Sequence, residues 1–265
     1  MDLRGIVRGT VGWPQLEAIG AELARRADRE QVRITFLDAD NWLSTPLVVD
    51  ERWFVKVITP QNALVHAVLT GARNAGVFSS GTEGFFGRFD GPVEMARHEL
   101  EATREMRRIG LNAPAPVGVF EFDEFGVLVL EYLKDFRTFE DLSTAEKRRR
   151  ADELFGALRR MHDDELAHGD LRGENVLIAD DELYFIDATY VREEGLASAR
   201  SYDLACALAV LAPTIGARDA IEAATTHYSP KEVLAAREFL DFVKMRPDHD
   251  FDAALVKGEI EKVAD

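Results

Sequence analysis

An acid, a carboxamide and a second acid lie close together between His168 and Asp187. Asp170 precedes Asn175 by five residues, and Asp187 ends the apolar run 184–186. Phosphoryl transfer from a metal-bound nucleotide uses such a set, because one carboxylate orients the attacking hydroxyl while an amide oxygen and a second carboxylate hold the metal ion. Two uncompensated carboxylates about 4 Å apart would repel by roughly 4 kcal/mol at an effective dielectric near 20. The segment therefore predicts a metal ion between Asp170 and Asp187.

The spacing distinguishes Asp170 from an ordinary loop aspartate, which usually caps a neighbouring turn. Asn175 stands directly before the apolar residues 176–178, and residues 184–186 form a second short apolar run. We expect a hairpin that turns at residues 180–181 and returns Asp187 toward Asn175. This geometry assigns Asp170 as a candidate base and the other two residues as candidate metal ligands.

Lys56 lies in residues 54–58, a run that is apolar on both faces and therefore predicts a central strand. An unpaired ammonium buried there would cost several kcal/mol, so we expect a phosphate or carboxylate partner. Lys56 is also the only lysine before Lys134. The alternative is a lysine whose ammonium snorkels to water at the edge of a sheet.

Glu99 is the expected partner of Lys56. A helix predicted over residues 93–109 carries one narrow stripe, made of Met95, Glu99, Ala102, Met106 and Ile109. An acid in the middle of an apolar stripe needs a cation. The alternative is a half-exposed glutamate at the border of the stripe.

The surrounding pattern predicts an α+β chain, with strands and helices first and mostly helices afterwards. We expect a helix over 14–29, strands over 32–37, 46–49, 53–58, 118–122 and 127–132, and a long helix that begins at a capping box formed by Ser143 and Glu146. Residues 59–92 are interpreted as an insertion that is helical over 61–72. The glycines that follow, between residues 76 and 91, favour a disordered linker over a lid.

Composition limits the class of protein. The 265 residues carry 48 acidic and 32 basic side chains, with a net charge of −16, and 46% of them are hydrophobic. We interpret the scarcity of lysine and the excess of acid as favouring solubility in concentrated salt, and the acidity argues against direct nucleic-acid binding. No apolar run approaches the ~20 residues that span a bilayer. One cysteine and no signal-peptide core at the start favour a cytoplasmic protein.

These residues together carry a resemblance. The Lys56 strand, the Glu99 helix, the apolar segment 127–133 and the His-Gly-Asp-x-x-x-x-Asn motif of 168–175 resemble the protein-kinase-like superfamily. Within it the chain is most similar to the compact atypical kinases, namely the RIO type and the small kinase of the tRNA threonylcarbamoylation complex, and more distantly to aminoglycoside phosphotransferases. The similarity covers about residues 31–212. It implies a two-lobed fold with an antiparallel N-lobe sheet and helix C, and a mostly helical C-lobe.

The resemblance also implies roles for residues of both lobes. Lys56 would contact the nucleotide phosphates and Glu99 would hold Lys56, while the backbone from Glu131 to Leu133 would meet the adenine. Asp170 would be the catalytic base, with Asn175 and Asp187 as ligands of Mg²⁺ or Mn²⁺. His168 would be structural. Asp203 would brace the catalytic loop, although plain capping of a helix N-terminus explains that residue equally well.

Two departures from the family pattern matter. Residues 38–45 contain no glycine, so a phosphate-wrapping glycine loop is missing, and Ser44 and Thr45 are left as weak candidates for phosphate contacts. Ala188 and Thr189 follow Asp187, and only fifteen residues separate it from Asp203. An activation loop with a peptide-docking platform does not fit in that space.

The expected organisation is a helical extension over 1–30, an N-lobe over 31–133 and a C-lobe over 134–265. The expected function is that of an ATP-dependent, atypical serine/threonine protein kinase. Two alternatives stay open: a small-molecule kinase, and an ATP-binding or ATPase scaffold without a phosphoacceptor. A protein or a small molecule is expected as the acceptor, with no membrane partner.

Overall fold

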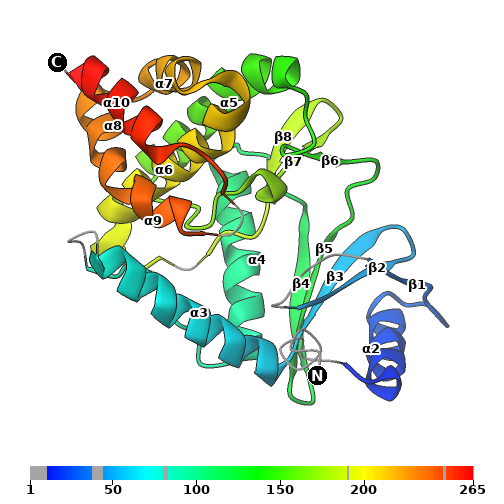
Figure 1. Cartoon of the computed structure of the whole chain (residues 1–265). Coiled ribbons are helices and arrows are strands. Elements are labelled where there is room, and N and C mark those ends of the chain that lie inside the picture. Colours follow the sequence, from blue (N-terminus) through cyan, green and yellow to red (C-terminus); the bar gives the residue numbers. More distant parts are fainter. Residues whose placement is uncertain (1–10, 38–43, 80–82, 190, 247–248, 265) are drawn as a thin grey trace. The chain divides into compact units, whose positions relative to one another are not determined.

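The computed structural model describes residues 11–37, 44–79, 83–189, 191–246 and 249–264. The chain divides into two compact units, which are described one at a time. The sheet unit comprises residues 1–71, 88–105 and 114–134, and the helical unit comprises residues 72–87, 106–113 and 135–265. Figure 1 shows the elements of both units in the colours of the sequence.

The sheet unit is built on five antiparallel strands in the order β1-β2-β3-β5-β4. Their bounds are β1 (Ile34–Phe36), β2 (Thr45–Val49), β3 (Trp53–Ile58), β4 (Pro116–Phe122) and β5 (Phe125–Glu131). Strand β3 is central, as its apolar run predicted, and Lys56 pairs with Pro46 on one side and Leu128 on the other. The β2–β3 turn places Asp50 and Glu51 at φ of 54° and 52°.

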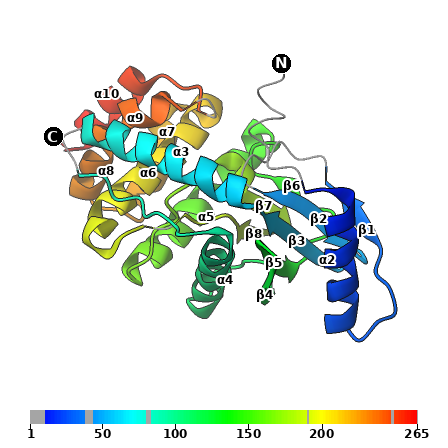
Figure 2. The ribbon, with the colours of Figure 1, turned by 90° about the horizontal axis from the view of Figure 1, so that it is seen from below.

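Two helices pack on opposite faces of this sheet. Helix α2 (Trp13–Arg26) buries Leu16, Ile19 and Leu23 against Val55 and Val57, and Figure 2 shows it beside strands β1 to β3. Helix α4 (Pro92–Arg108) packs through three apolar side chains on the face that carries Ile58, Leu128 and Leu130; these side chains are Met95, Ala96 and Leu100. Because side chains alternate along a strand, Lys56 points to the α4 face.

Helix α3 corrects the prediction for the insertion. It runs from Pro60 to Ser79, seven residues beyond the predicted end, and the chain passes from the sheet unit to the helical unit within it. Gly76 lies inside this helix, where the absence of a side chain makes room for the Phe242 ring, which lies 2.4 Å from an ideal Cβ position. Phe85 and Phe86 are buried in the helical core. The disordered-linker interpretation is therefore wrong for the described residues.

The helical unit is organised around helix α6 (Leu196–Ile215), which contacts helices α5, α7, α8, α9 and α10. Their bounds are α5 (Thr144–Asp163), α7 (Ala217–Thr225), α8 (Pro230–Ala236), α9 (Leu240–Lys244) and α10 (Ala253–Ala264), with short 3-10 helices η1 (Gly173–Asn175), η2 (Glu193–Gly195) and η3 (Arg237–Phe239). The predicted capping box at Ser143 and Glu146 is present. Helix α5 faces the core with four buried apolar residues, Ala151, Leu154, Leu158 and Met161.

A small sheet completes the helical unit, with strands β6 (Arg137–Thr138), β7 (Val176–Ala179) and β8 (Glu182–Phe185) in that order. The β7–β8 hairpin turns at Asp180 and Asp181, both with positive φ, as predicted. The α+β class is confirmed: an antiparallel sheet with its helix belongs to the first unit, and helices dominate the second. No helix in the described ranges has the length and apolar character that a bilayer crossing requires.

Gly126 on β5 tests the packing of α4 on the sheet. An ideal Cβ at Gly126 would lie 2.2 Å from the Pro92 carbonyl oxygen, whereas one at Gly118 on β4 meets nothing within 4 Å. Because a backbone atom at the first residue of α4 cannot rotate away, we expect Gly126→Ala to lower the free energy of unfolding by about 1–3 kcal/mol. Gly118→Ala is the control, with an expected gain of at most about 1 kcal/mol. Urea unfolding measures both, and equal stability of the two variants would contradict this packing.

Candidate functional site

The loop that carries Asp170, the candidate base, is held by one buried carboxyl group. Asp203 is fully buried and accepts the backbone N–H groups of His168 at 2.6 Å and Gly169 at 2.8 Å. Helix α6 begins at Leu196, so Asp203 lies inside the helix and does not cap its N-terminus. The capping explanation is wrong, because the N-cap of α6 is Gly195, eight residues before Asp203. The contacts observed for Asp203 are those of a brace for the loop.

Asn175 joins Asp170 to the β7–β8 hairpin. Its amide nitrogen donates to the Asp170 carbonyl oxygen at 2.8 Å and lies 3.5 Å from the Asp170 Oδ2 atom. The backbone carbonyl oxygen of Asn175 accepts the Ile186 N–H at 3.1 Å, which fixes the residue directly before Asp187. Asp187 itself is half-buried with φ of 60°. The hairpin thus returns the chain to Asn175 at the residue before Asp187, as predicted.

Three guanidinium groups surround the Asp170 carboxylate. Arg73 and Arg246 both contact its Oδ1 atom, Arg246 at 2.9 Å, and Arg172 lies 3.5 Å from its Oδ2 atom. Burial by itself would raise the pKa of Asp170, but the three arginines outweigh burial and hold that pKa well below its usual range. Asp170 is therefore a carboxylate that these cations keep ionised.

The sheet unit holds the second pair that the sequence predicts. Lys56 Nζ lies 2.6 Å from Glu99 Oε1, and the two side chains are 5% and 16% exposed. The lysine is buried in the middle of β3, which rules out a snorkelling ammonium at a sheet edge. The ring centroid of Phe54 lies 5.8 Å from Nζ on the same face of the strand. A buried ammonium in this setting suits a phosphate as a second anionic partner, and that role stays a prediction.

The remaining nucleotide candidates of the sheet unit differ in their contacts. Ser44 is buried, and its hydroxyl has no hydrogen-bond partner among the described residues. Thr45 opens β2, opposite Val57. The Glu131 N–H donates to the Ala115 carbonyl oxygen. The glycine-free residues 38–43 lie outside the described ranges.

The segment after Glu131 offers one backbone donor. The Tyr132 N–H donates to the Arg52 carbonyl oxygen, and the Glu131 carboxylate accepts the Ala115 N–H. The Leu133 N–H forms no hydrogen bond within the described part of the chain. Of the three residues predicted to meet an adenine, Leu133 therefore carries the available N–H.

The donor set of the helical unit fits a hard divalent cation only in part. No group of three or more His, Cys, Asp or Glu side chains that could hold a metal is found in the described ranges. Magnesium, however, is held by one or two protein oxygens together with phosphates and water. Asn175 supplies a suitable carbonyl oxygen, because its amide nitrogen is already tied to the loop. Asn175 and Asp187 thus suit a metal that a nucleotide completes.

Sequence reasoning missed Arg73 and Arg246. Arg73 is the only charged residue among the twenty in α3, and this signal could have singled it out. Arg246 follows α9 with no distinctive local pattern. It lies 76 residues from Asp170 in the sequence, so only the fold brings the two together.

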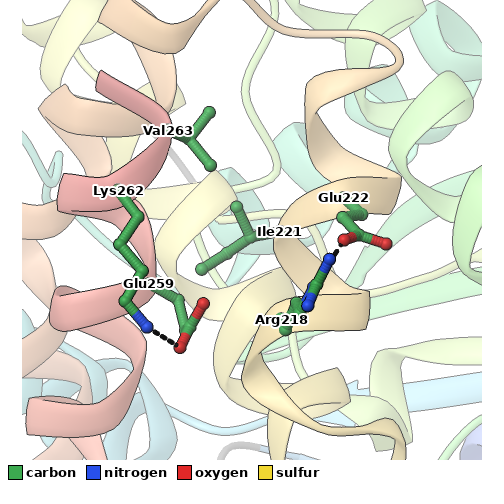
Figure 3. Close-up of a pocket in the computed structure, with 6 residues that line it drawn as sticks. All are labelled: Arg218, Ile221, Glu222, Glu259, Lys262 and Val263. Carbon is green, nitrogen blue, oxygen red and sulfur yellow. Dashed lines mark hydrogen bonds and ion pairs between the residues drawn. The ribbon is translucent and has the colours of Figure 1, made fainter. Parts of the chain in front are cut away.

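A pocket in the helical unit lies apart from the predicted chemistry. Residues of α7 and α10 line it, as Figure 3 shows, with the ion pairs Arg218–Glu222 and Lys262–Glu259 on opposite walls. Each pair joins neighbours within one helix, as is common on solvated helix surfaces. None of the predicted site residues lines this pocket.

The chain was compared with known proteins. Residues 92–199 match the model of the RIO domain, and no curated protein sequence matches the chain. Among solved structures, the kinase domain of PknI from Mycobacterium tuberculosis is 13% identical with a TM-score of 0.45, covering 88% of this chain and 96% of that one. The PAN3 pseudokinase of Drosophila melanogaster is 14% identical with a TM-score of 0.39, covering 85% and 63%.

The match of residues 92–199 to the RIO domain confirms the predicted resemblance to RIO-type kinases over that segment. The matched segment runs from the first residue of α4 into α6. It includes Glu99, Asp170, Asn175 and Asp187. Lys56 lies outside it, and so do both arginines that contact Asp170 Oδ1.

His168 gives the loop a measurable pH dependence. Its side chain is fully buried, and burial lowers its pKa from the ordinary value of 6.5, with Asp203 opposing the shift. The unfolded chain therefore binds the proton more tightly than the folded protein does. The contribution of neutral His168 to the free energy of unfolding is fully present above pH 6.5 and is lost as the pH falls below that value. We expect the unfolding free energy of the wild type to fall by up to about 1.4 kcal/mol per pH unit between pH 6.5 and 5.

The matched variants are His168→Asn and His227→Asn. His227 is partly exposed and lies 2.8 Å from Asp152. We expect His168→Asn to flatten the pH dependence of denaturant unfolding, whatever its stability at pH 7, and His227→Asn to keep the slope of the wild type. Parallel pH profiles for the wild type and His168→Asn would contradict the assignment of the loss to His168.

Proposed function

We propose that this protein is an ATP-dependent phosphotransferase that requires Mg²⁺ or Mn²⁺ and transfers the γ-phosphate to a hydroxyl group, with protein serine or threonine as the first choice of acceptor. The observation that carries the proposal is the set of hydrogen bonds that holds the loop 168–175 at both of its ends. Asp203 holds His168 and Gly169, and the Asn175 amide holds Asp170. A loop fixed from both ends presents a carboxylate in one orientation, which phosphoryl transfer requires.

In this proposal the side chains divide the work. Lys56, held by Glu99, contacts the nucleotide phosphates, with Ser44 and Thr45 as further phosphate contacts. Asn175 and Asp187 hold the metal. The buried, unpartnered hydroxyl of Ser44 supports its part, and the N–H of Leu133, next to Glu131, serves the adenine.

The reaction is balanced without a further reactant. The acceptor oxygen forms a bond to the γ-phosphorus, the bond from that phosphorus to the β–γ bridging oxygen breaks, and ADP leaves with the electron pair. The hydroxyl proton passes to the Asp170 carboxylate. Positioning and charge neutralisation supply most of the rate enhancement.

A second candidate function is an ATP-binding or ATPase scaffold. Arg73 and Arg246 both contact Asp170 Oδ1, one of the two oxygens that can accept the proton of an acceptor hydroxyl. If nothing displaces them, nucleotide binding or slow hydrolysis is all that the site performs. A small-molecule kinase is the remaining alternative, and the nature of the acceptor distinguishes it from a protein kinase.

Replacing the base separates a phosphotransferase from a scaffold. We expect Asp170→Asn to lower the metal-dependent transfer of labelled γ-phosphate by about 10²- to 10⁴-fold, because a general base contributes that much. Asp219→Asn, on the exposed surface of α7, should keep the rate of the wild type. The assay is run at molar and at low salt because of the net charge of −16. Binding of ATP with no transfer to any acceptor under either condition would overturn the phosphotransferase proposal.

The metal assignment has its own test. We expect Asp187→Ala to weaken magnesium–ATP binding by at least about tenfold, the loss that even indirect partners of a metal ligand cause. Circular dichroism should show that the fold is retained, and Asp219→Ala should bind as the wild type does. Isothermal titration measures both affinities. An unchanged affinity in Asp187→Ala would remove this residue from the metal site.

A further inference from the structure

Arg73 and Arg246 reach the same oxygen of the proposed base from opposite ends of the helical unit's sequence. They lie 97 residues before and 76 residues after Asp170. Their side chains are 24% and 10% exposed, and that of Asp170 is 13% exposed. Partly buried arginines lose less to solvent screening than exposed ones do. The contacts are therefore a built feature of the fold.

Buried aromatic rings hold both guanidinium groups in place. The Arg73 guanidinium lies 5.2 Å from the ring centroid of Phe86, and Arg246 Nη1 donates to the Tyr202 hydroxyl. The rings of Phe86 and Tyr202 pack edge to face, with centroids 5.5 Å apart. Asn74, beside Arg73, bonds both the N–H and the carbonyl oxygen of Phe86 at 3.0 Å. The two arginines are thus held on a common support.

The chemistry of this cluster selects for negative charge. Each guanidinium offers five N–H donors in a planar fork, which matches the oxygens of a phosphate or carboxylate. Three such groups converge on the carboxylate of Asp170, and Glu174 lies 3.4 Å from one of them, Arg172, so the cluster of three arginines and two carboxylates carries a net positive charge. This gathering of arginines stands in a chain whose net charge is −16.

An acceptor hydroxyl must approach within about 3 Å of Asp170 to give up its proton. At Oδ1 it meets Arg73 and Arg246. A neutral acceptor has to compete with two ion pairs for that oxygen, whereas an anionic group takes over guanidinium donors and leaves the oxygen to the hydroxyl. A cationic neighbour of the hydroxyl would be repelled.

We propose that Arg73 and Arg246 form an anion-binding site for the acceptor, which selects a hydroxyl flanked by a phosphate or carboxylate group. The proposal rests on the phosphotransferase function and deepens it by naming the class of acceptor. The anionic group binds the two arginines, and the neighbouring hydroxyl takes their place at Asp170 Oδ1. The hydroxyl oxygen then forms the bond to the γ-phosphorus, its proton passes to Asp170, and ADP leaves.

Binding of inorganic phosphate tests the site without any turnover. We expect the wild type to bind phosphate in a low-chloride buffer, and Arg73→Gln and Arg246→Gln each to weaken that binding by at least tenfold in isothermal titration. Arg237→Gln is the matched control. It removes the same charge from a partly exposed arginine of the helical unit that pairs with Glu261, and it should bind as the wild type does. Equal phosphate binding in all four proteins would overturn the proposal.

Kinetics then tests the selection. The acceptors are a serine peptide flanked by glutamate, the same peptide with glutamine, glycerol 3-phosphate, and glycerol. We expect kcat/KM to be at least tenfold higher for the acidic member of one pair, which identifies a peptide or a small molecule as the source of the anion. Arg73→Gln should remove the preference mainly through KM for the acceptor, and Arg73→Lys should restore it only in part because the planar fork is lost.

Three results are distinguishable. No preference for the acidic acceptors in an active wild type would overturn the anion site. In Arg73→Gln, a rise in KM for ATP with an unchanged KM for the acceptor would assign the arginines to the nucleotide. That result would also overturn the anion site. If the wild type transfers phosphate neither to any of the four acceptors nor to itself, the phosphotransferase function fails instead. The phosphate titration then still decides whether the anion site exists.

Discussion

The proposed chemistry depends on one buried contact, the Asp203 carboxyl group that accepts two consecutive backbone N–H groups of the loop that carries Asp170. A carboxyl group buried in a helical core is costly unless its oxygens are satisfied. Here His168 and Gly169 satisfy them at 2.6 and 2.8 Å. Asp170 is the next residue, so the position of the proposed base follows from a requirement of the core. His162 Nε2 lies 3.4 Å from the same carboxyl group. The other ring nitrogen of His162 shares a hydrogen bond with the Tyr228 hydroxyl at 2.9 Å. These contacts extend the brace into α5.

Periodicity and turn chemistry were sufficient for much of the fold. The apolar run around Lys56 predicted the central strand, and the stripe around Glu99 predicted its partner, because burying an ammonium in a sheet leaves few alternatives to an acid on the covering helix. The Asp180–Asp181 turn predicted the hairpin that carries Asn175 and leads to Asp187. Each of these inferences uses either residues that are neighbours in the sequence or the need of one buried charge for a partner of opposite sign.

The errors share a physical cause, which is that distant packing overrides local signals. The glycines between residues 76 and 91 favour a disordered linker, yet α3 continues through Gly76, and the Phe242 ring packs in the space that a side chain would need. The start of α6 at Leu196 was missed, since its first turn has no side-chain cap. Arg246 could not be assigned to Asp170 from sequence, because no local pattern links residues 76 positions apart. Only Arg73 carried a usable signal, as the lone charge in its helix.

The most direct test of the account is a crystal structure with magnesium and a non-hydrolysable ATP analogue. We expect the metal to bind the Asn175 side-chain oxygen and the Asp187 carboxylate, and Lys56 to contact the phosphates. We expect Asp170 to face the γ-phosphate without binding the metal. A nucleotide bound elsewhere, for example between α7 and α10, or a metal that avoids both Asn175 and Asp187, would contradict it.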